Sequence, residues 1–375
     1  MYYAIAAVFA LAAIFSVRHA LADFEFRRAT PASVARAVEL APSNTEYLLL
    51  RALQLDYDGA DPAALLERAA ALNPLSAAPR IRLGLGAEIR GDNAAAERWL
   101  LDAARIDRQF EPRWTLANFY FRRDNLAEFW KWTRAALQIS YGDRRPLFDL
   151  CWRATDDAET VAHAIPGQRE VLSAYLVYLL ETHRVAAAAP IALRLAAFGD
   201  PADRPILGAA CDAFIDARLV SQAQRVWRAL YGDHTGVFHP TFAAPRIGHG
   251  FDWRSAEIPG VVELDLDEPA CRRITFDGRE PESCELLRQM LMLEPGRAYK
   301  LRWRVPMSDV NSGLEWRIAG AHAPLSAGEL SFTASSELVP LTLNYDRPQG
   351  EPRAEGSIEI SSVTVQKKSA ANERE

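Results

Sequence analysis

The chain has 375 residues, of which 49% are hydrophobic and 25% charged, with a formal net charge of −6 at neutral pH. This composition is typical of folded globular proteins and excludes wholesale disorder, and the length favours more than one domain. The acidic balance, with arginines scattered among Asp and Glu, argues against nucleic-acid binding, because phosphate neutralisation needs clustered Lys and Arg.

The chain begins with an apolar segment from Tyr2 to Val17, followed at once by Arg18. A membrane span needs about 20 apolar residues, and the core of a signal peptide about 7 to 15. We expect residues 1–22 to form a signal-anchor or transmembrane helix, because a helix that continues through Ala22 reaches spanning length. The alternative is export followed by cleavage at the small residues of Ala20-Leu21-Ala22.

Two arguments predict opposite orientations of this helix in a membrane. Arg18, Arg27 and Arg28 all follow the apolar segment, so the positive-inside rule would place the body in the cytoplasm. We expect instead a single-pass protein of a bacterial-type inner membrane with a periplasmic body, for a reason that comes from the C-terminal domain.

Residues 29–232 carry apolar positions at helical spacing, separated by turn residues. Short connections make successive helices antiparallel neighbours. The predicted helices are Thr30–Leu40, Asn44–Tyr57, Pro62–Leu72, Ala77–Arg90, Ala94–Ile106, Pro112–Arg122, Leu126–Ile139, Pro146–Ala154, Asp157–Ile165, Arg169–Thr182, Arg184–Phe198, Pro205–Asp216 and Ser221–Tyr231.

Part of this helical region repeats. Ala37, Ala69, Ala103 and Ala135 recur at steps of 32, 34 and 32 residues. A period near 34 built from a helical hairpin indicates a solenoid, whose units bury their apolar faces by stacking.

One unit, from Leu75 to Gln109, resembles a tetratricopeptide (TPR) repeat. The residues that carry the resemblance are Leu83-Gly84, Ala87, Gly91, Ala96, Leu100 and Ala103. The next unit keeps Trp114 at the first bulky position, but Arg123 is aligned with the turn glycine. The resemblance implies a TPR-like α-solenoid with a groove that binds a protein or peptide.

Aromatic residues are concentrated between residues 114 and 132. Consecutive aromatics cannot all point inward from one helix. We therefore expect Trp114, Phe121 and Trp130 to contact a partner, and the alternative is that they pack between helices.

After Gly236 the apolar pattern alternates, and residues 236–366 are predicted to form an antiparallel β-sandwich, followed by a disordered tail at 367–375. Trp303 and Trp316 fall on the apolar side of the alternation and are predicted core residues. The predicted strands are Val261–Leu266, Cys271–Phe276, Leu286–Leu293, Ala298–Val305, Gly313–Ile318, Leu330–Thr333, Leu338–Tyr345 and Gly356–Val365.

Three stretches of this region resemble jelly-roll carbohydrate-binding modules, also called galactose-binding-like domains. They are Gly250-Phe251-Asp252-Trp253, Leu291 to Tyr299, and Ile358 to Val363. The resemblance implies a polysaccharide ligand and hence a location on the polysaccharide side of a membrane. Such modules often hold calcium through an acidic residue near the last strand, where this chain has Ser361 and Ser362, so we expect no metal.

A sugar site needs polar groups on a solvated sheet face. The candidate glycan-binding residues are Glu285, Gln289, Arg302, Arg304 and Arg317, with Glu315 beside them. The alternative is an ordinary surface on which Glu315 pairs across strands with Arg302 or Arg304.

Cys271 and Cys284 lie on consecutive predicted strands, and either a disulfide or two free thiols fits the sequence. His234, His239 and His249 match no metal-ligand spacing and are predicted to be solvated. No nucleophile elbow, HExxH motif or Walker loop is present, so we expect neither a cofactor nor catalysis.

The sequence therefore predicts a non-catalytic, membrane-anchored scaffold or adaptor that takes part in cell-surface polysaccharide assembly or export. Two alternatives are a structural protein that contacts only other proteins and an enzyme whose site lies between the helical and β domains.

Overall fold

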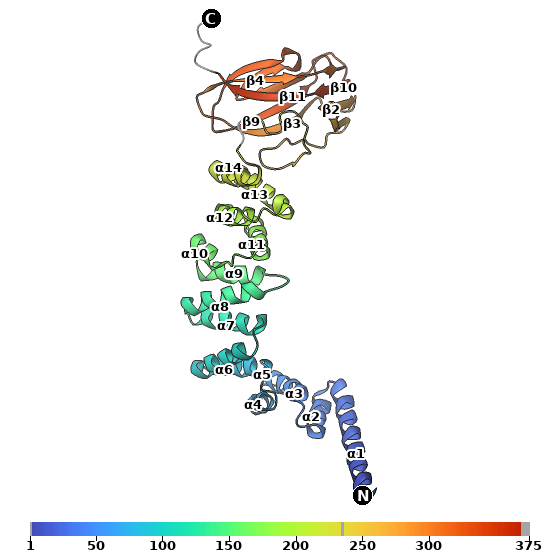
Figure 1. Ribbon diagram of the computed structural model, residues 1–375, viewed down its shortest axis with the longest axis vertical. Helices are drawn as coiled ribbons and strands as arrows, with labels where there is room; N and C mark the ends of the chain where they lie inside the picture. The colour runs from blue at the N-terminus through green and yellow to red at the C-terminus, as the bar shows by residue number, and fades with distance from the viewer. Residues whose placement is uncertain (1, 234–235, 369–375) are drawn as a thin grey trace. The chain divides into compact units, whose positions relative to one another are not determined.

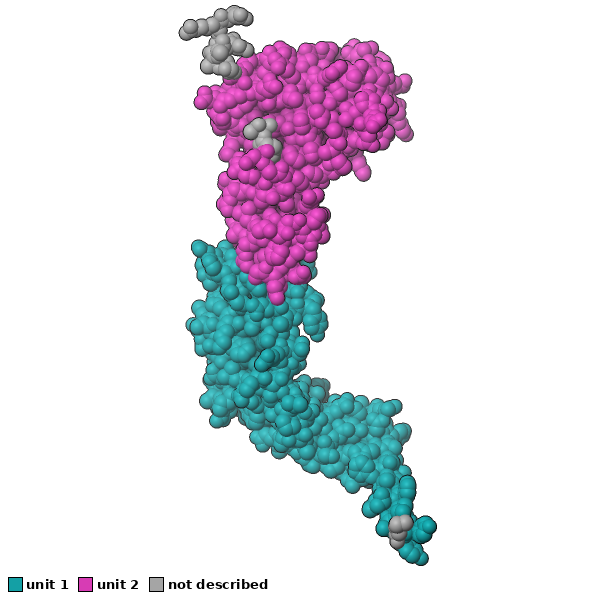
Figure 2. All heavy atoms as spheres, in the orientation of Figure 1, with its two compact units in different colours: residues 1–166 teal, residues 167–375 magenta. Residues whose placement is uncertain are grey.

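A computed structural model of the chain describes residues 2–233 and 236–368 (Figure 1). It divides into two compact units, Met1–Pro166 and Gly167–Glu375, which Figure 2 colours separately. Residues 369–375, which are most of the expected tail at 367–375, lie outside the described residues, and so does His234.

The first unit is entirely helical. Its helices are α1 (Tyr2–Arg27), α2 (Pro31–Leu40), α3 (Thr45–Tyr57), α4 (Ala63–Leu72), α5 (Ala78–Ile89), α6 (Asn93–Ile106), α7 (Phe110–Arg122), α8 (Leu126–Ile139), α9 (Arg145–Ala154) and α10 (Ala158–Ala164). Each helix from α1 to α8 packs against the next. The predicted row of paired helices is confirmed, with boundaries displaced by a few residues at most.

Local sequence explains where these helices begin. The side chains of Asn44, Asp92 and Asn125 each accept a hydrogen bond from a backbone N–H in the first turn of α3, α6 and α8. Thr30 and Ser33 form a reciprocal capping box at the start of α2, where Pro31 occupies the first helical position.

The turn within each hairpin keeps its geometry where the sequence pattern fades. Gly91 has a φ of 82°, and the corresponding residue in the next hairpin is Asp124, with a φ of 52°. The alignment of Arg123 with the turn glycine was therefore wrong by one position. Asp tolerates the left-handed region better than most residues do, so the turn persists without glycine.

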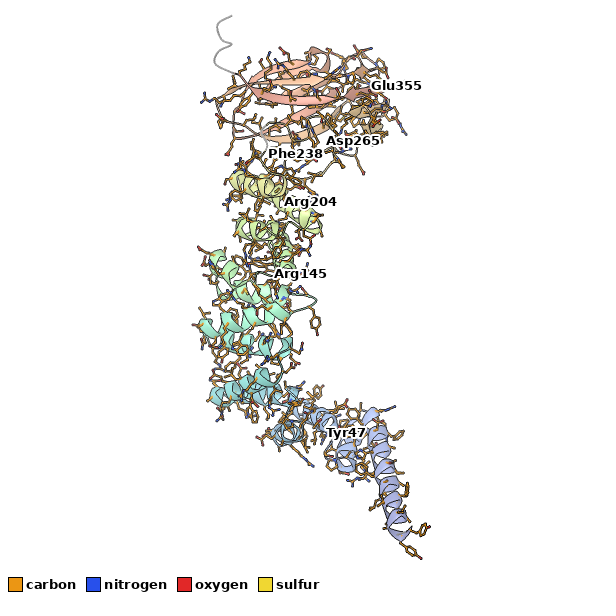
Figure 3. The ribbon with its side chains drawn as sticks, viewed as in Figure 1. Tyr47, Arg145, Arg204, Phe238, Asp265 and Glu355 are labelled. Carbon is orange, nitrogen blue, oxygen red and sulfur yellow. The ribbon has the colours of Figure 1, made fainter. Side chains whose placement is uncertain are left out.

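The N-terminal helix α1 has two different parts. From Tyr2 to Arg18 its side chains are exposed, whereas Ala22 is buried and Phe26 packs on Tyr47 of α3 with ring centroids 4.5 Å apart. Figure 3 labels Tyr47. Within the described residues, α1 is the one helix long and apolar enough to cross a membrane, a property that signal sequences share.

The second unit contains four helices and all the strands. The helices are α11 (Arg169–Glu181), α12 (Val185–Ala196), α13 (Arg204–Asp216) and α14 (Val220–Tyr231), with a short 3-10 helix η1 (Pro201–Asp203) before α13. In α14, Ala223, Val226 and Trp227 are fully buried.

The strands form three antiparallel sheets. The first sheet has the order β1 (Val261–Asp267), β2 (Ala270–Asp277), β10 (Glu355–Ile360) and β5 (Met307–Ser308). The second has the order β11 (Ser362–Lys367), β4 (Ala298–Arg304) and β8 (Glu329–Thr333). The third has the order β3 (Ser283–Met292), β9 (Leu338–Asp346), β6 (Leu314–Ile318) and β7 (Ala321–Pro324), and a 3-10 helix η2 (Leu325–Ala327) follows it.

The predicted antiparallel β architecture is confirmed, but the two-sheet arrangement is not. The single strand predicted at Gly356–Val365 is two strands, β10 and β11, which separate at Ser361 and join different sheets. The N–H of Ser361 donates to the carbonyl of Arg304, 2.9 Å away, so the backbone stays satisfied where the chain changes sheet. The jelly-roll assignment itself stays a prediction.

One hydrophobic core fills the space between the sheets. It includes Ile274 and Ile358 from the first sheet, Leu301 and Trp303 from the second, and Trp316 from the third. The prediction that Trp303 and Trp316 are core residues is confirmed. The Nε1–H of Trp303 donates to the carbonyl of Leu325 at 2.6 Å, which satisfies its polar atom inside the core.

The helices of the second unit are joined to the strands by a built interface at residues 237–254. Asp212 of α13 accepts hydrogen bonds from His249 Nδ1 at 2.6 Å and from the Gly250 N–H at 2.7 Å, and from the guanidinium of Arg254. Trp227 of α14 lies edge-on to the rings of Phe238 and Phe251. Figure 3 labels Phe238 at this position.

We expect alanine substitution at two glycines of this interface, Gly248 and Gly250, to lower the stability by different amounts. Gly248 and Gly250 both have positive φ, but a Cβ on Gly250 would lie 2.3 Å from the Trp227 ring, whereas nothing lies within 4 Å of one on Gly248. We expect Gly248→Ala to cost about 1 kcal/mol through backbone strain alone and Gly250→Ala about 2 kcal/mol more through overpacking. Denaturant unfolding followed by tryptophan fluorescence measures both, and equal losses would contradict the interface.

Candidate functional site

Two of the hollows in the structure, one in each unit, have linings that combine apolar and polar groups. The first is a groove of about 420 Å³, here called the α3–α5 groove. Its residues are Ala52, Leu53, Asp56, Gly59, Ala60, Asp61, Pro62, Leu66, Arg82, Leu85, Gly86, Ile89 and Arg90. They come from α3, α4, α5 and the loop between α3 and α4.

The α3–α5 groove has an apolar floor and charged edges. Leu66 is buried beneath it, Leu85 is half-buried, and Ile89 is 85% exposed. The edges carry Asp61 and Arg90, whose charged atoms are 3.9 Å apart. Such an exposed isoleucine in a concave apolar surface is suited to covering by another chain.

Sequence analysis missed this groove, although a signal was present. In α5, Ile81, Leu83, Gly84 and Ala87 make the buried face that the repeat pattern identified. Leu85 and Ile89 are four residues apart and form a second apolar stripe. Leu85 is partly covered by Ala77, Ile81 and Ala103, whereas Ile89 stays exposed.

The three predicted partner-binding aromatics lie elsewhere in the first unit. Trp114 stacks on Phe110 with ring centroids 6.1 Å apart, and Phe121 lies under the guanidinium of Arg153. Trp114, Phe121 and Trp130 are all partly buried against the same core cluster of α6 to α9. They contribute to inter-helix packing, as the alternative interpretation predicted.

Of these three aromatics, Trp130 also borders a cavity of about 380 Å³. The other residues of that cavity include Arg134 of α8 and Asp157 and His163 beside or within α10. Trp114 and Phe121 do not line it. The structure thus does not gather the three aromatics on one groove, and their role in partner binding stays a prediction.

The predicted glycan-binding residues are divided between two sheets. Arg302 and Arg304 lie on β4 of the second sheet, whereas Glu285 and Gln289 lie on β3 and Arg317 on β6 of the third. The condition for a shared face, that their strands neighbour one another, is not met between these two groups, because the strands belong to different sheets. A role of these residues in glycan binding stays a prediction.

Gln289 is not on a solvated face at all. Its side chain is fully buried, its amide nitrogen donates to the Phe238 carbonyl at 2.8 Å, and its amide oxygen accepts from the Phe238 N–H at 3.1 Å. Gln289 therefore fastens the segment after α14 to β3, and both ends of its amide are used.

Three of the remaining four candidates are held in ion pairs. Glu285 binds Arg288 through two hydrogen bonds of 2.7 and 2.8 Å, and Arg302 pairs with Glu329 at 3.5 Å. Arg317 binds Glu315 on its own strand and Asp346 on β9. Glu315 thus pairs with Arg317, not with Arg302 or Arg304 as the alternative proposed.

Arg304 differs from the other candidates because it lines the second hollow. This cleft, here called the Arg304 cleft, has a volume of about 430 Å³. Its residues are Trp303, Arg304, Val305, Ser308, Val310, Asn311, Ser312, Gly313, Leu314, Pro324, Leu325, Ser326 and Gly328. They come from the ends of β4, β5, β6 and β7 and from the connections between them.

The histidines near the interface are not solvated as predicted. His239 Nδ1 is 3.1 Å from Asp252, which is fully buried, and His249 binds Asp212. Within residues 2–233 and 236–368, no three or more His, Cys, Asp or Glu side chains are grouped so that they could hold a metal ion.

No family model matches the chain, and no curated protein matches it. Among solved structures, the chain is similar to Naa15/Naa10 bound to HypK-THB, with 13% identity and a TM-score of 0.31 over 59% of this chain and 37% of that one. It is also similar to the C-terminal part of a TPR repeat-containing protein from Cytophaga hutchinsonii, with 13% identity and a TM-score of 0.31 over 56% of this chain and 92% of that one.

A further similarity is to the human IFIT1 dimer with m7Gppp-AAAA, with 16% identity and a TM-score of 0.27 over 53% of this chain and 54% of that one. The chain thus spans only about a third of the Naa15/Naa10 chain and half of the IFIT1 chain. Similarities at this level of identity and TM-score assign neither a family nor a function.

The four cysteines are all free thiols, so the disulfide alternative for Cys271 and Cys284 is not adopted. Burial raises the pKa of the Cys151 and Cys211 thiols to about 12 and that of Cys284 to about 11, and it also raises the pKa of Cys271. A raised pKa keeps a thiol protonated and therefore a poor nucleophile.

We expect thiol titration of the purified chain, without reductant, to count four free thiols in denaturant. In the native state at pH 8 the same reagent should react far more slowly, because the thiolate fraction is small and access is limited. A count of two thiols in denaturant would contradict the structure at Cys271 and Cys284.

Proposed function

We propose that this chain is a non-catalytic, membrane-anchored scaffold that holds a segment of another protein in the α3–α5 groove. The observation that supports this function is Ile89, a large apolar side chain left 85% exposed at the edge of a concave apolar surface. Helical repeats present such surfaces already ordered, so binding costs little rearrangement of the scaffold.

The magnitudes fit reversible recognition. Covering an exposed Ile89 and the remaining surface of Leu85 would contribute about 1.5 to 3 kcal/mol per side chain. Asp56 and Asp61 on one side and Arg82 and Arg90 on the other would add orientation to the bound segment, since charged edges favour one direction over its reverse.

The anchor in this proposal is the exposed part of α1. The apolar residues from Tyr2 to Val17 have no covering within the described residues of the chain, and lipid would cover them. The helix does not end at the expected cleavage site. It continues to Arg27, and its last turns pack on α2 and α3.

Cleavage near Ala22 would remove parts of the folded body. The Arg18 guanidinium donates to the carbonyls of Glu39 and Leu40 at the end of α2, where helix carbonyls lack internal partners. Ala22 is itself buried in the cluster with Ala37, Ala41 and Tyr47. A retained helix is therefore favoured over a removed signal peptide.

We propose further that the body faces the polysaccharide side of the membrane and takes part in assembly or export of cell-surface polysaccharide. The support for this part is the Arg304 cleft, a polar hollow in the module that resembles carbohydrate-binding domains. Arg18, Arg27 and Arg28, which follow the apolar segment, oppose this orientation, so the side of the membrane is the point to test first.

The groove is tested by site-specific photocrosslinking of the full chain in its own membranes. A photoreactive residue at position 89 should give one dominant cross-linked protein, because Ile89 borders the groove. The matched control is position 75, since Leu75 is 84% exposed but lies outside the groove. The same products from both positions would contradict a binding role for the groove.

The anchor is tested by intact mass and fractionation. We expect the chain to be extracted from membranes only by detergent and to keep its full mass of 41.7 kDa, because α1 is part of the first helical pair. A soluble product that lacks about 22 N-terminal residues would show a cleaved signal peptide. The side of the membrane is tested by two fusions at the C-terminus, one to alkaline phosphatase and one to a fluorescent protein. An inactive phosphatase together with a fluorescent protein that is bright would place the C-terminus in the cytoplasm and overturn the polysaccharide part of the proposal.

A further inference from the structure

The basic side chains of the β module are almost all neutralised by a neighbouring carboxylate. On β4, for example, Lys300 and Arg302 both pair with Glu329, and Arg317 on β6 pairs with Glu315 and Asp346. Within residues 236–368 the structure gives no carboxylate partner to Arg304, Arg353 or Lys368, and only Arg304 of these three lines the Arg304 cleft.

The lining of the Arg304 cleft is rich in hydroxyl and amide groups and contains no carboxylate. Ser308, Asn311, Ser312 and Ser326 contribute these groups, and Arg304 is the one charged residue of the lining. Glu351 binds the hydroxyl of Ser312 from outside and is not part of the lining. Arg304 is therefore the one charge in the lining itself, and Glu351 is the carboxylate bound to its edge.

The walls of the cleft are held in place by the fold. Trp303, in the floor, is fixed by its hydrogen bond to Leu325, and Ser308 donates to the carbonyl of Val310 at 2.7 Å. Gly313 has a φ of 81°, and a Cβ there would lie 2.6 Å from the Asp346 carbonyl oxygen. Small residues at this turn thus keep the backbone close to β9 and leave the cleft open.

We propose that the Arg304 cleft binds a carboxylate-bearing sugar, that is, a uronic acid residue of an acidic saccharide. A guanidinium matches a carboxylate with two parallel hydrogen bonds. Hydroxyl and amide side chains exchange hydrogen bonds with sugar hydroxyls, and Val305, Pro324 and Leu325 offer apolar contacts to the ring carbons.

The lining favours this ligand over two simpler ones. A neutral sugar would use the polar side chains but gain no charged hydrogen bond from Arg304, whereas an isolated phosphate would use the guanidinium but few of the four polar side chains around it. The volume of about 430 Å³ is within the range of small-molecule sites and far exceeds that of one inorganic anion.

This inference rests on the polysaccharide part of the proposed function and not on the α3–α5 groove, which belongs to the other unit. Failure of saccharide binding would therefore leave crosslinking at position 89 unaffected, and the two proposals can fail separately.

The test is calorimetric titration of the full chain in detergent with an oligogalacturonate, a neutral oligogalactose of equal length, and inorganic phosphate. We expect the oligogalacturonate to bind at least tenfold more tightly than the other two. Arg304→Ala should weaken its binding about tenfold or more, since a hydrogen bond between charged groups is lost, and Arg304→Lys should weaken it less.

The control variant is Arg302→Ala, two residues earlier on the same strand, exposed like Arg304 but paired with Glu329. It should leave oligogalacturonate affinity unchanged. Equal losses in Arg302→Ala and Arg304→Ala, equal affinity for phosphate and oligogalacturonate, or no binding of oligogalacturonate would each overturn the proposal.

Discussion

The arrangement of the second unit depends on how Asp212 and Trp227 hold the segment between the last helix and the first strand. Asp212 accepts from His249, Gly250 and Arg254 at once, and the Trp227 ring fills the space that Gly250 leaves. Hydrogen bonds to a charged group contribute about 1.5 to 3 kcal/mol each when partly buried. The loss of one carboxylate would therefore release three donors together.

The same segment is fixed from the strand side. Asp252 is fully buried and accepts from the Ile247 N–H at 2.6 Å, while Gln289 closes on both backbone groups of Phe238. A connection between a helical region and a β module usually consists of exposed polar residues. Here it is part of the core, so the module is an extension of α13 and α14 and not a freely tethered domain.

The helices were predictable because their signals are local. Capping by Asn44, Asp92 and Asn125 and apolar stripes fix each helix within its own residues. The left-handed turn at Asp124 was harder to predict. Such a turn is expected in a sequence where glycine occurs, but the backbone needs only a residue that can adopt a positive φ, as Asp124 does. The break at Ser361 does leave a signal in the sequence. The buried residues are Ile358 and Ile360 before it and Val363 after it, so the apolar alternation shifts by one residue where the hydrogen-bonding partners change, and a single predicted strand ignores this shift.

The candidate sites were less predictable than the fold, because a binding surface is defined by what remains unsatisfied after folding. On β4, Arg302 and Arg304 are two residues apart and equivalent in sequence, yet only Arg302 faces Glu329. Gln289 was assigned to a surface because glutamine is polar, and the buried carbonyl and N–H of Phe238 decided its position. Whether such a polar side chain is paired, buried or left free is decided by partner residues that lie far away in the chain.

The continuity of α1 determines how its exposed apolar part is joined to the rest of the first unit. A flexible linker at this point would let the two parts move independently, as glycine- or serine-rich segments do. Here the exposed apolar turns pass into the turns that pack on α2 and α3 without a break in the helix. Arg18 lies where the exposed apolar part ends and also donates to the last carbonyls of α2, so one residue links the exposed part of α1 to the first hairpin. Phe26 of α1 packs on Tyr47 of α3, and α3 also lines the α3–α5 groove, so the N-terminal helix and the groove share one packed element.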